Sequence, residues 1–168
     1  LIPGETNQEV VMVAHLCHPR PSANDNASGS ATALEIARIL QKLVDGGKLA
    51  PPQRGLRFLW VPEMTGTYAY LATREDEIGQ MVAGINLDMV GQNQELCGSS
   101  FLIECPPQAM PSFASVLLER LREELLGETS AFGGTGSYAL FRYAVTPFSG
   151  GSDHYILSDP SVGVPTPM

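Results

Sequence analysis

Short apolar runs alternate with helical repeats along the chain, and polar residues follow each run. Three continuous apolar stretches have the length and composition of buried strands: residues 9–14 (EVVMVA), 55–61 (GLRFLWV) and 82–87 (VAGINL). Residues 31–44 carry apolar positions at roughly helical spacing and stop at a pair of glycines, which predicts a helix. Strand, polar loop and helix in this order predict an α/β layer architecture.

Weaker patterns predict the remaining elements. They are a short helix at 67–71, strands at 102–104 and 144–148, a helix at 111–126, and turns at 133–136 and 149–152. The helix at 111–126 is amphipathic, with one apolar stripe formed by Phe113, Val116, Leu117, Leu121 and Leu125. We expect a three-layer sandwich in which helices flank a central mixed, mostly parallel sheet.

Length and charge narrow the class of protein. The 168 residues suffice for one α/β domain, and the net charge of −8 without any basic run argues against nucleic-acid and anionic-membrane partners. No apolar stretch approaches the roughly 20 residues that span a bilayer. Three cysteines are too few for a disulfide framework and favour a reducing compartment. We expect residues 1–168 to be a single partial catalytic domain, truncated at both ends.

Acidic and histidine side chains follow several predicted strands. These residues are His15, Glu63, Asp88, Asp153 and His154, and the loop before the first helix adds Asp25. In open α/β sheets the ligand site lies beyond the carboxyl ends of the strands, so such side chains converge there. Imidazole with several carboxylates is a ligand set that catalytic zinc takes. A nearby unligated carboxylate then serves as general base in hydrolysis.

Four ordered segments carry a resemblance to a known family. They are VVMVAHLCHPRPSANDNASGSATALEIARIL, LRFLWVPEMTGTYAYL, GINLDMVG and GGSDHYIL followed by GVP. Together they resemble the zinc aminopeptidases of peptidase clan MH, whose nearest branch contains leucyl aminopeptidases and, more distantly, glutaminyl cyclases. The resemblance implies a metallo-aminopeptidase that acts on a peptide substrate with one or two zinc ions.

The resemblance assigns roles to particular residues. It implies that His15, Asp25 and Asp88 are zinc ligands, with Asp25 bridging two metals. Glu63 falls where the family has two adjacent glutamates, a general base and a zinc ligand, and Met64 follows it here. Glu63 is therefore either the catalytic base or a ligand, and the sequence leaves both open.

Other positions depart from the family pattern or lie beside the site. Cys17 stands where the family usually has an aspartate that orients the histidine ring, so the support of His15 must differ. Asp153 and His154 match a segment close to the site and are expected beside the ligands or along the substrate. The family's last histidine ligand is expected beyond Met168.

Simpler interpretations compete with these roles. His15 could end a strand, Asp25 could cap a helix, and Asp88 could form a turn. A His15, Cys17 and His18 cluster could hold zinc by itself, but a structural site needs four ligands. Cys97 and Cys105 are interpreted as buried thiols at strand edges. Alternative functions are a glutaminyl-cyclase-like acyltransferase and a non-catalytic binding domain with a degraded site.

Overall fold

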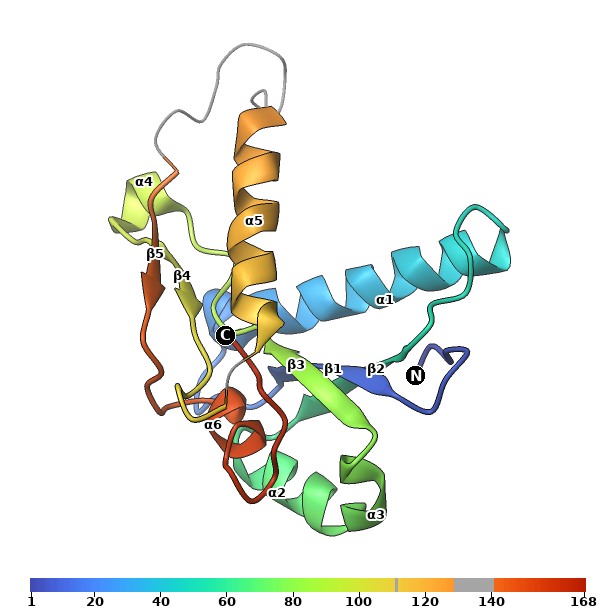
Figure 1. Ribbon diagram of the computed structural model, residues 1–168. Helices are drawn as coiled ribbons and strands as arrows, with labels where there is room; N and C mark the ends of the chain where they lie inside the picture. Colours follow the sequence, from blue (N-terminus) through green and yellow to red (C-terminus); the bar gives the residue numbers. More distant parts are fainter. Residues whose placement is uncertain (111, 129–140) are drawn as a thin grey trace.

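A three-stranded parallel sheet forms the centre of the computed structural model, which describes residues 1–110, 112–128 and 141–168 (Figure 1). The strands are β1 (Glu9–His15), β2 (Gly55–Val61) and β3 (Met81–Asn86), in the order β2-β1-β3. β1 pairs in parallel with both neighbours, and His15 lies opposite Val61. The carboxyl ends of the three strands therefore meet at one edge of the sheet.

A second parallel pair, β4 (Phe101–Glu104) and β5 (Tyr143–Thr146), is joined to β3 by residues 164–168. Gly84 and Asn86 donate backbone hydrogen bonds to the carbonyls of Pro165 and Pro167, which makes this contact parallel. Glu104 and Met168 exchange both backbone hydrogen bonds, the pattern of an antiparallel pair. The expectation of a mixed, mostly parallel sheet flanked by helices is confirmed.

Gly84 is required where β3 meets the C-terminal segment. A Cβ atom at this position would lie 2.4 Å from the Thr166 hydroxyl oxygen, closer than two such atoms approach. A glycine at this position therefore allows the two backbones to hydrogen-bond along their length.

The helices lie on both sides of the central sheet (Figure 1). Their bounds, including the irregular turn η1, are η1 (Ala23–Ser28), α1 (Gly29–Asp45), α2 (Thr65–Ala72), α3 (Glu75–Ile78), α4 (Gln94–Cys97), α5 (Phe113–Glu128) and α6 (Asp153–Leu157). In Figure 1, α1 lies above the sheet and α2, α3 and α6 lie below it. The predicted helices and strands are all found in the described residues, with ends shifted by a few positions.

The main core lies between the sheet and the helices below it. It contains Val11 and Val13, which alternate onto one face of β1, together with Leu71 of α2 and Ile156 and Leu157 of α6. The side chains on this face of β1 thus belong to the same core cluster as α6, the short helix that begins with Asp153 and His154. Burial of α6 fixes where these two polar residues lie.

The apolar stripe of α5 is largely exposed. The five residues predicted to form it, Phe113 to Leu125, expose between 43% and 67% of their surface.

The prediction of buried thiols at strand edges is wrong for Cys97, which is exposed at the end of α4, whereas Cys105 is half-buried after β4. Pro111 and the turn predicted at 133–136 lie outside the described residues. In the part of the chain that the structure describes, every helix is too short or too polar to cross a bilayer.

Replacing Leu157 by alanine should lower the free energy of unfolding by about 2–5 kcal/mol, because the side chain is fully buried and leaves a cavity. Chemical denaturation measures this. Leu34→Ala on α1 is the matched control, since Leu34 is 61% exposed and should change stability by less than about 0.5 kcal/mol. Equal losses for both variants would contradict the position of the core.

Candidate metal centre

His15 is the last residue of β1 and is almost fully buried. Its Nδ1 atom lies 2.9 Å from the carbonyl oxygen of Cys17, so this nitrogen carries the proton and donates it. Nε2 is then left with its lone pair facing the strand ends. Ser30 also donates to the backbone carbonyl of His15 at 2.9 Å, which ties the strand end to α1. This arrangement is typical of metal-binding histidines.

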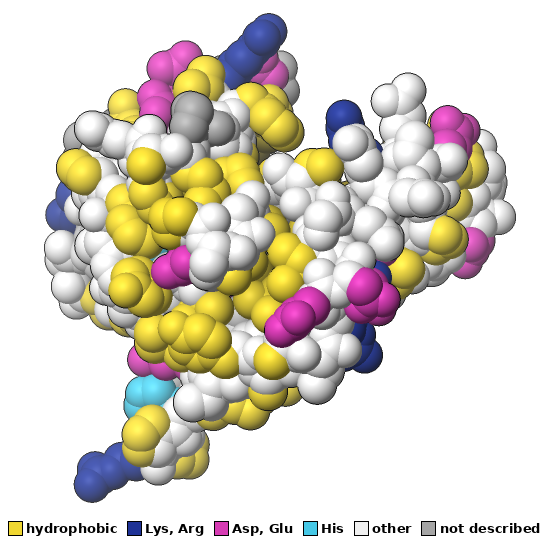
Figure 2. All heavy atoms as spheres, turned by 60° about the horizontal axis from the view of Figure 1, so that its bottom comes forward, with side chains coloured by type: hydrophobic (Ala, Val, Ile, Leu, Met, Phe, Trp, Pro, Cys, Tyr) yellow, Lys and Arg dark blue, Asp and Glu magenta, His cyan; other side chains and the backbone are white. Residues whose placement is uncertain are grey.

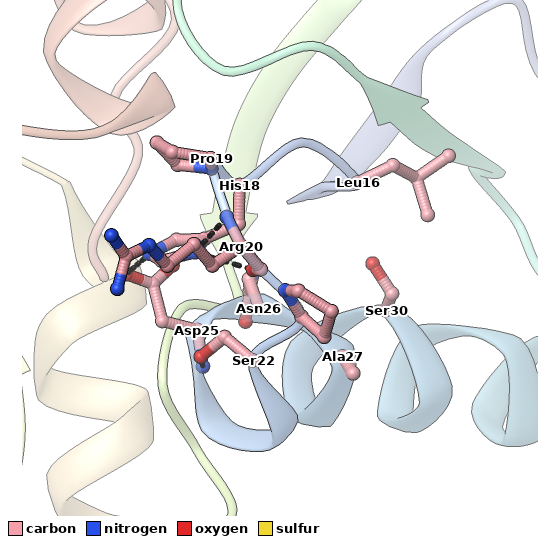
Figure 3. Close-up of a pocket in the computed structure, with 10 residues that line it drawn as sticks. Leu16, His18, Pro19, Arg20, Ser22, Asp25, Asn26, Ala27 and Ser30 are labelled. Atoms are coloured by element: carbon pink, nitrogen blue, oxygen red, sulfur yellow. Dashed lines mark hydrogen bonds and ion pairs between the residues drawn. The ribbon is translucent and has the colours of Figure 1, made fainter.

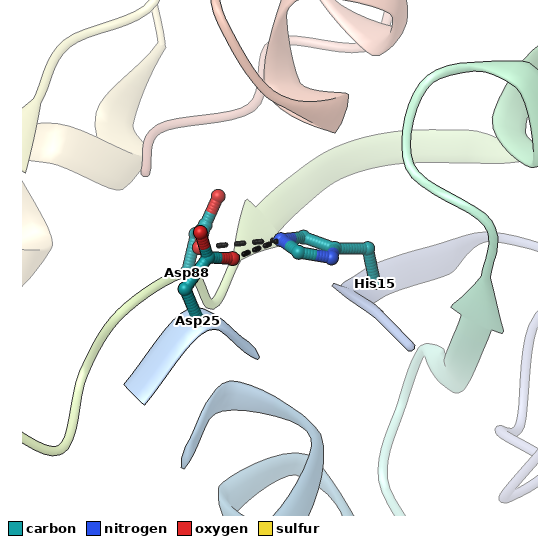
Figure 4. A group of neighbouring side chains, drawn as sticks. All are labelled: His15, Asp25 and Asp88. Carbon is teal, nitrogen blue, oxygen red and sulfur yellow. Dashed lines mark ion pairs between the residues drawn. The ribbon is translucent and has the colours of Figure 1, made fainter. Parts of the chain in front are cut away.

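Asp25 and Asp88 face the same nitrogen from two other segments. Their Oδ1 atoms lie 3.2 Å and 3.4 Å from His15 Nε2 (Figure 4). One ligand atom from each of the three residues lies within 4.8 Å of the others, so the group could hold a metal ion. The predicted convergence of these side chains is confirmed by this geometry. Their role as ligands stays a prediction.

Asp88 Oδ1 is buried and has no hydrogen-bond partner within the described ranges. The contact with His15 Nε2 at 3.4 Å joins two acceptor atoms when that nitrogen is unprotonated, so it does not satisfy the oxygen. Buried carboxylate oxygens without partners are costly. A cation between the three residues would satisfy this oxygen, and the residues present therefore fit a metal.

Asn26 holds together the segments that carry Asp25 and Asp88. The sequence analysis did not assign it this role. Its side-chain amide donates to the Leu87 carbonyl at 2.8 Å, and its side-chain oxygen accepts the backbone N–H groups of Gly29 and Met89, each at 3.1 Å. The residue is 3% exposed. The residues beside Asp25 and Asp88 are thus bonded directly to each other. The asparagines that flank Asp25 in the sequence are the signal from which this role could have been inferred.

Glu63 lies two residues beyond β2, and its Oε1 atom is 3.9 Å from His15 Nε2. Burial raises the pKa of the Glu63 carboxyl above its ordinary value. The His15 ring acts in the opposite direction. The carboxylates that raise this pKa further are those of Asp88, Asp153 and Asp25. A carboxyl with a raised pKa beside a candidate metal group suits proton transfer.

Cys17 supports the site in two ways that differ from an aspartate. Its backbone carbonyl, not its side chain, accepts from the His15 ring. Its Sγ atom accepts the backbone N–H of Glu63 at 3.0 Å. A backbone carbonyl thus takes the place of the carboxylate that the resemblance leads one to expect.

Asp153 fixes the backbone immediately after Glu63. The residue is fully buried, and its Oδ1 atom accepts the Met64 N–H at 2.8 Å and the Thr67 hydroxyl at 2.6 Å. Met64 has a positive φ of 54°, a strained conformation for a residue with a side chain. Asp153 therefore stabilises the turn that points Glu63 toward the site.

Met89 has the same kind of conformation, with φ of 55°. In the described part of the chain, Met64 and Met89 are the non-glycine residues with positive φ, and each directly follows an acidic residue of the candidate centre. Such strain concentrates at functional sites, where the surrounding contacts hold it in place.

His154 lies apart from the His15 group. Its ring is 1% exposed, with Nε2 2.8 Å from Glu104 Oε1 and Nδ1 3.5 Å from the Asn86 amide. Glu104 also accepts the N–H and hydroxyl of Ser149, at 2.6 Å and 2.8 Å. This buried polar cluster links β3, β4 and α6. His154 therefore contacts the sheet through Glu104. It does not lie on an open surface along which a substrate would bind.

Two cavities flank the centre. One of about 510 Å³ lies on the Asp25 side and is lined by the loop from Leu16 to Ser22 and the start of α1 (Figure 3). The other, of about 630 Å³, lies on the Asp88 side. It is mostly apolar and is bounded by Met89 and by the α5 side chains Leu121 and Leu125. The candidate centre therefore lies at the border between a hollow of mixed polarity and an apolar one.

Comparisons with solved structures define the class of fold. Over 99% of its residues, the chain superimposes on 33% of a Clostridium acetobutylicum protein assigned as a peptidase, with a TM-score of 0.70 and 24% identity. Over 95% of its residues it matches 41% of Legionella pneumophila LapA, with a TM-score of 0.64 and 18% identity. The chain thus has an α/β fold similar to that of peptidase structures.

Residues 1–100 match the family described as domain of unknown function DUF4910, and the chain belongs to this family. An aminopeptidase of Pseudomonas aeruginosa is 32% identical over 133 residues, which are 71% of this chain and 22% of the relative. A Leptosphaeria maculans protein named probable zinc metalloprotease is 31% identical over 133 residues, 76% of this chain and 30% of the relative. The chain is therefore related to aminopeptidases and spans less than a third of these relatives.

Replacing Asn26 by alanine should destabilise the fold by about 1–3 kcal/mol for each buried backbone group left unpaired. It should also weaken metal binding, because Asp25 and Asp88 would no longer be held side by side. Chemical denaturation and chelator competition measure the two effects. Asn7→Ala, in an exposed turn, is the control and should leave both unchanged. Unchanged stability of the Asn26 variant would show that these bonds do not hold the loops.

The Glu63 carboxyl should titrate above its ordinary pKa in metal-free protein, because burial penalises its charged form. Carboxyl-carbon NMR measures the midpoint. Asp153→Asn removes a negative charge that raises this pKa, so the midpoint should fall. Asp45→Asn, at the far end of α1, is the control and should leave it unchanged. A Glu63 midpoint at or below the ordinary value would refute the buried environment.

Proposed function

We propose that this chain is the catalytic part of a zinc-dependent aminopeptidase of the clan MH type. The observation that carries the proposal is the buried, unpartnered Asp88 Oδ1 within the His15, Asp25 and Asp88 group. Relatives named aminopeptidase and zinc metalloprotease support it. The similarity to solved structures supports the fold on which this chemistry would occur.

The residues of the centre have separate roles in this proposal. His15 Nε2 and one oxygen each of Asp25 and Asp88 would hold the zinc ion. When bound, zinc lowers the pKa of water to near 7 and polarises a carbonyl oxygen. Asn26 keeps the two carboxylates adjacent, and the Cys17 carbonyl fixes the tautomer of His15.

Glu63 is assigned the role of general base and not of ligand. Its nearest oxygen lies 3.9 Å from His15 Nε2, outside the tighter group of His15, Asp25 and Asp88, and its pKa is raised. Glu63 Oε1 would accept the proton of the attacking water and return it to the leaving amine. Asp153, through the Met64 N–H, would keep this carboxylate in position.

The substrate proposed is a peptide with a free N-terminus. The chain has 18 acidic and 10 basic residues, so its charge favours the cationic α-amino group of such a substrate over a polyanion. On the face shown in Figure 2, Lys and Arg side chains lie singly and apart from one another, among acidic and apolar side chains. Given this distribution of charge, we propose neither a nucleic-acid nor a membrane partner.

Glu63→Gln should lower kcat for an aminoacyl p-nitroanilide by at least about 100-fold with zinc content unchanged, because a general base supplies roughly 10²–10⁴-fold. His15→Ala should lose zinc as well as activity. Arg38→Ala, in an exposed pair on α1, is the control for both. Zinc analysis and initial rates on the same preparations separate the two roles, since zinc loss in the Glu63 variant would make Glu63 a ligand.

Product analysis distinguishes aminopeptidase from the alternative acyl transfer. A peptide with N-terminal glutamine should yield free glutamine and a shortened peptide. Formation of pyroglutamyl peptide without hydrolysis would replace the proposed reaction by cyclisation. Zinc-loaded protein that neither hydrolyses nor cyclises a panel of peptides would favour a binding domain.

A further inference from the structure

The guanidinium of Arg20 has no hydrogen bond or ion pair within the described ranges, although the residue lines the cavity beside Asp25. Every other arginine has a partner for this group, and the pairs are Arg38 with Glu35, Arg54 with Gln8, Arg57 with Glu9, Arg74 with Glu77, Arg120 with Glu124, Arg122 with Glu123 and Arg142 with the Ser99 carbonyl. A guanidinium is always charged and presents five N–H donors in a planar fork. Arg20 is exposed, so its donors are available to a ligand.

The backbone of Arg20 is held in place, whereas its side chain is free. His18 Nδ1 lies 2.8 Å from the carbonyl oxygen and 3.3 Å from the amide nitrogen of Arg20. Pro19 and Pro21 flank the residue and fix two further φ angles of the loop. The other nitrogen of the same ring, His18 Nε2, lies 3.3 Å from Asp25 Oδ2. The loop is thereby tied to the candidate centre, and less entropy is lost when Arg20 binds a ligand there.

The cavity that Arg20 lines has the size of a small-ligand site. Its volume of about 510 Å³ lies within the range of roughly 300–1,000 Å³ that such sites have. Figure 3 shows the loop with His18 and Arg20 on one side of this cavity and Ala27 and Ser30 on the other. The apolar cavity lies on the opposite side of the centre, beside Asp88. A peptide whose scissile carbonyl lies at the centre would therefore extend toward an apolar cavity at one end and toward Arg20 at the other.

The charge of the centre makes a cation at this position useful. Asp25, Glu63 and Asp88 are acidic, and the chain has a net charge of −8, so a carboxylate of the substrate is repelled there. Arginine pairs with carboxylates through two parallel N–H···O bonds, which gives such a contact both strength and a fixed geometry. A peptide always carries a carboxylate at its C-terminus unless it is blocked. The unpaired Arg20 side chain thus has the chemistry to offset this repulsion.

We propose that Arg20 binds a carboxylate on the part of the substrate that leaves as the amine. This carboxylate is either the C-terminus of a dipeptide or the side chain of an acidic second residue, and the protein prefers such substrates to neutral ones. The inference rests on the proposed function, because the zinc-dependent cleavage fixes which part of the peptide leaves. Arg20 determines substrate preference through binding and takes no part in the chemical step.

Steady-state kinetics of the zinc-loaded protein with Leu-Gly and Leu-Gly amide test this assignment. Wild type should have the lower KM for the free acid. Arg20→Ala should raise the KM for Leu-Gly at least about 10-fold with kcat nearly unchanged, a loss of about 1.4 kcal/mol by the standard conversion. The KM for the amide should stay the same. Arg20→Lys keeps the charge but not the planar fork, and its KM for Leu-Gly should lie between those of wild type and Arg20→Ala.

A second pair of substrates identifies the source of the carboxylate. Leu-Asp amide and Leu-Asn amide both have a blocked C-terminus and differ in the charge of the second side chain. An Arg20-dependent preference for the Asp amide assigns the contact to an acidic second residue, whereas one seen only with Leu-Gly assigns it to the C-terminus. Arg38→Ala is the matched control, because it removes the same charge from an exposed pair on α1 and should keep every preference.

A binding measurement separates this inference from the proposed function. In metal-free protein the Arg20 Nε–H resonance should shift on titration with Leu-Gly and not with Leu-Gly amide. Zinc-loaded protein that hydrolyses none of the four substrates, while this shift is present, would overturn the proposed function and leave the carboxylate site standing. Hydrolysis with equal KM values for each acidic and neutral pair, or an equal rise of KM for both members in Arg20→Ala, would overturn the Arg20 assignment alone. Neither hydrolysis nor a shift would overturn both.

Discussion

The hydrogen bonds of the Asn26 side chain are the constraint on which the candidate centre depends. One buried amide bonds to the segment after β3 and to the start of α1, and so joins two loops that are 61 residues apart in the chain. Carboxylates repel each other unless a proton or cation lies between them. Asp25 and Asp88 therefore need a neutral neighbour that holds their backbones together, and an amide does so without adding charge.

The parallel sheet supplies the rest of the geometry, and this part follows from the sequence. Apolar runs followed by His15, Glu63 and Asp88 imply parallel strands whose polar ends meet at one edge, as observed. The short helices α3, α4 and α6 were not predicted, because four or five residues are too few for a helical repeat to show. The role of Asn26 could not be predicted from the sequence, since its long-range partners depend on the packing of β3.

Side-chain direction is the other feature that the sequence left open. Adjacent residues Asp153 and His154 were expected to act beside the site, and α6 turns them to different partners. Asp153 contacts the backbone after Glu63, whereas His154 contacts Glu104. The packing of Ile156 and Leu157 in the core determines this rotation. A one-residue difference on a helix rotates a side chain by about 100°, so neighbours in sequence rarely share a site.

Buried oxygens without hydrogen-bond partners are independent evidence that this edge of the sheet is a functional site. Among the described residues, Asp88 Oδ1 and Asp153 Oδ2 are buried carboxylate oxygens without a hydrogen-bond partner. Both carboxylates act on Glu63, whose pKa they raise after the larger effect of burial. Folded proteins rarely leave such atoms unpaired, because each one costs stability. Their presence around Glu63, together with strain at Met64 and Met89, is consistent with a site that binds a cation and is not satisfied by its own hydrogen bonds.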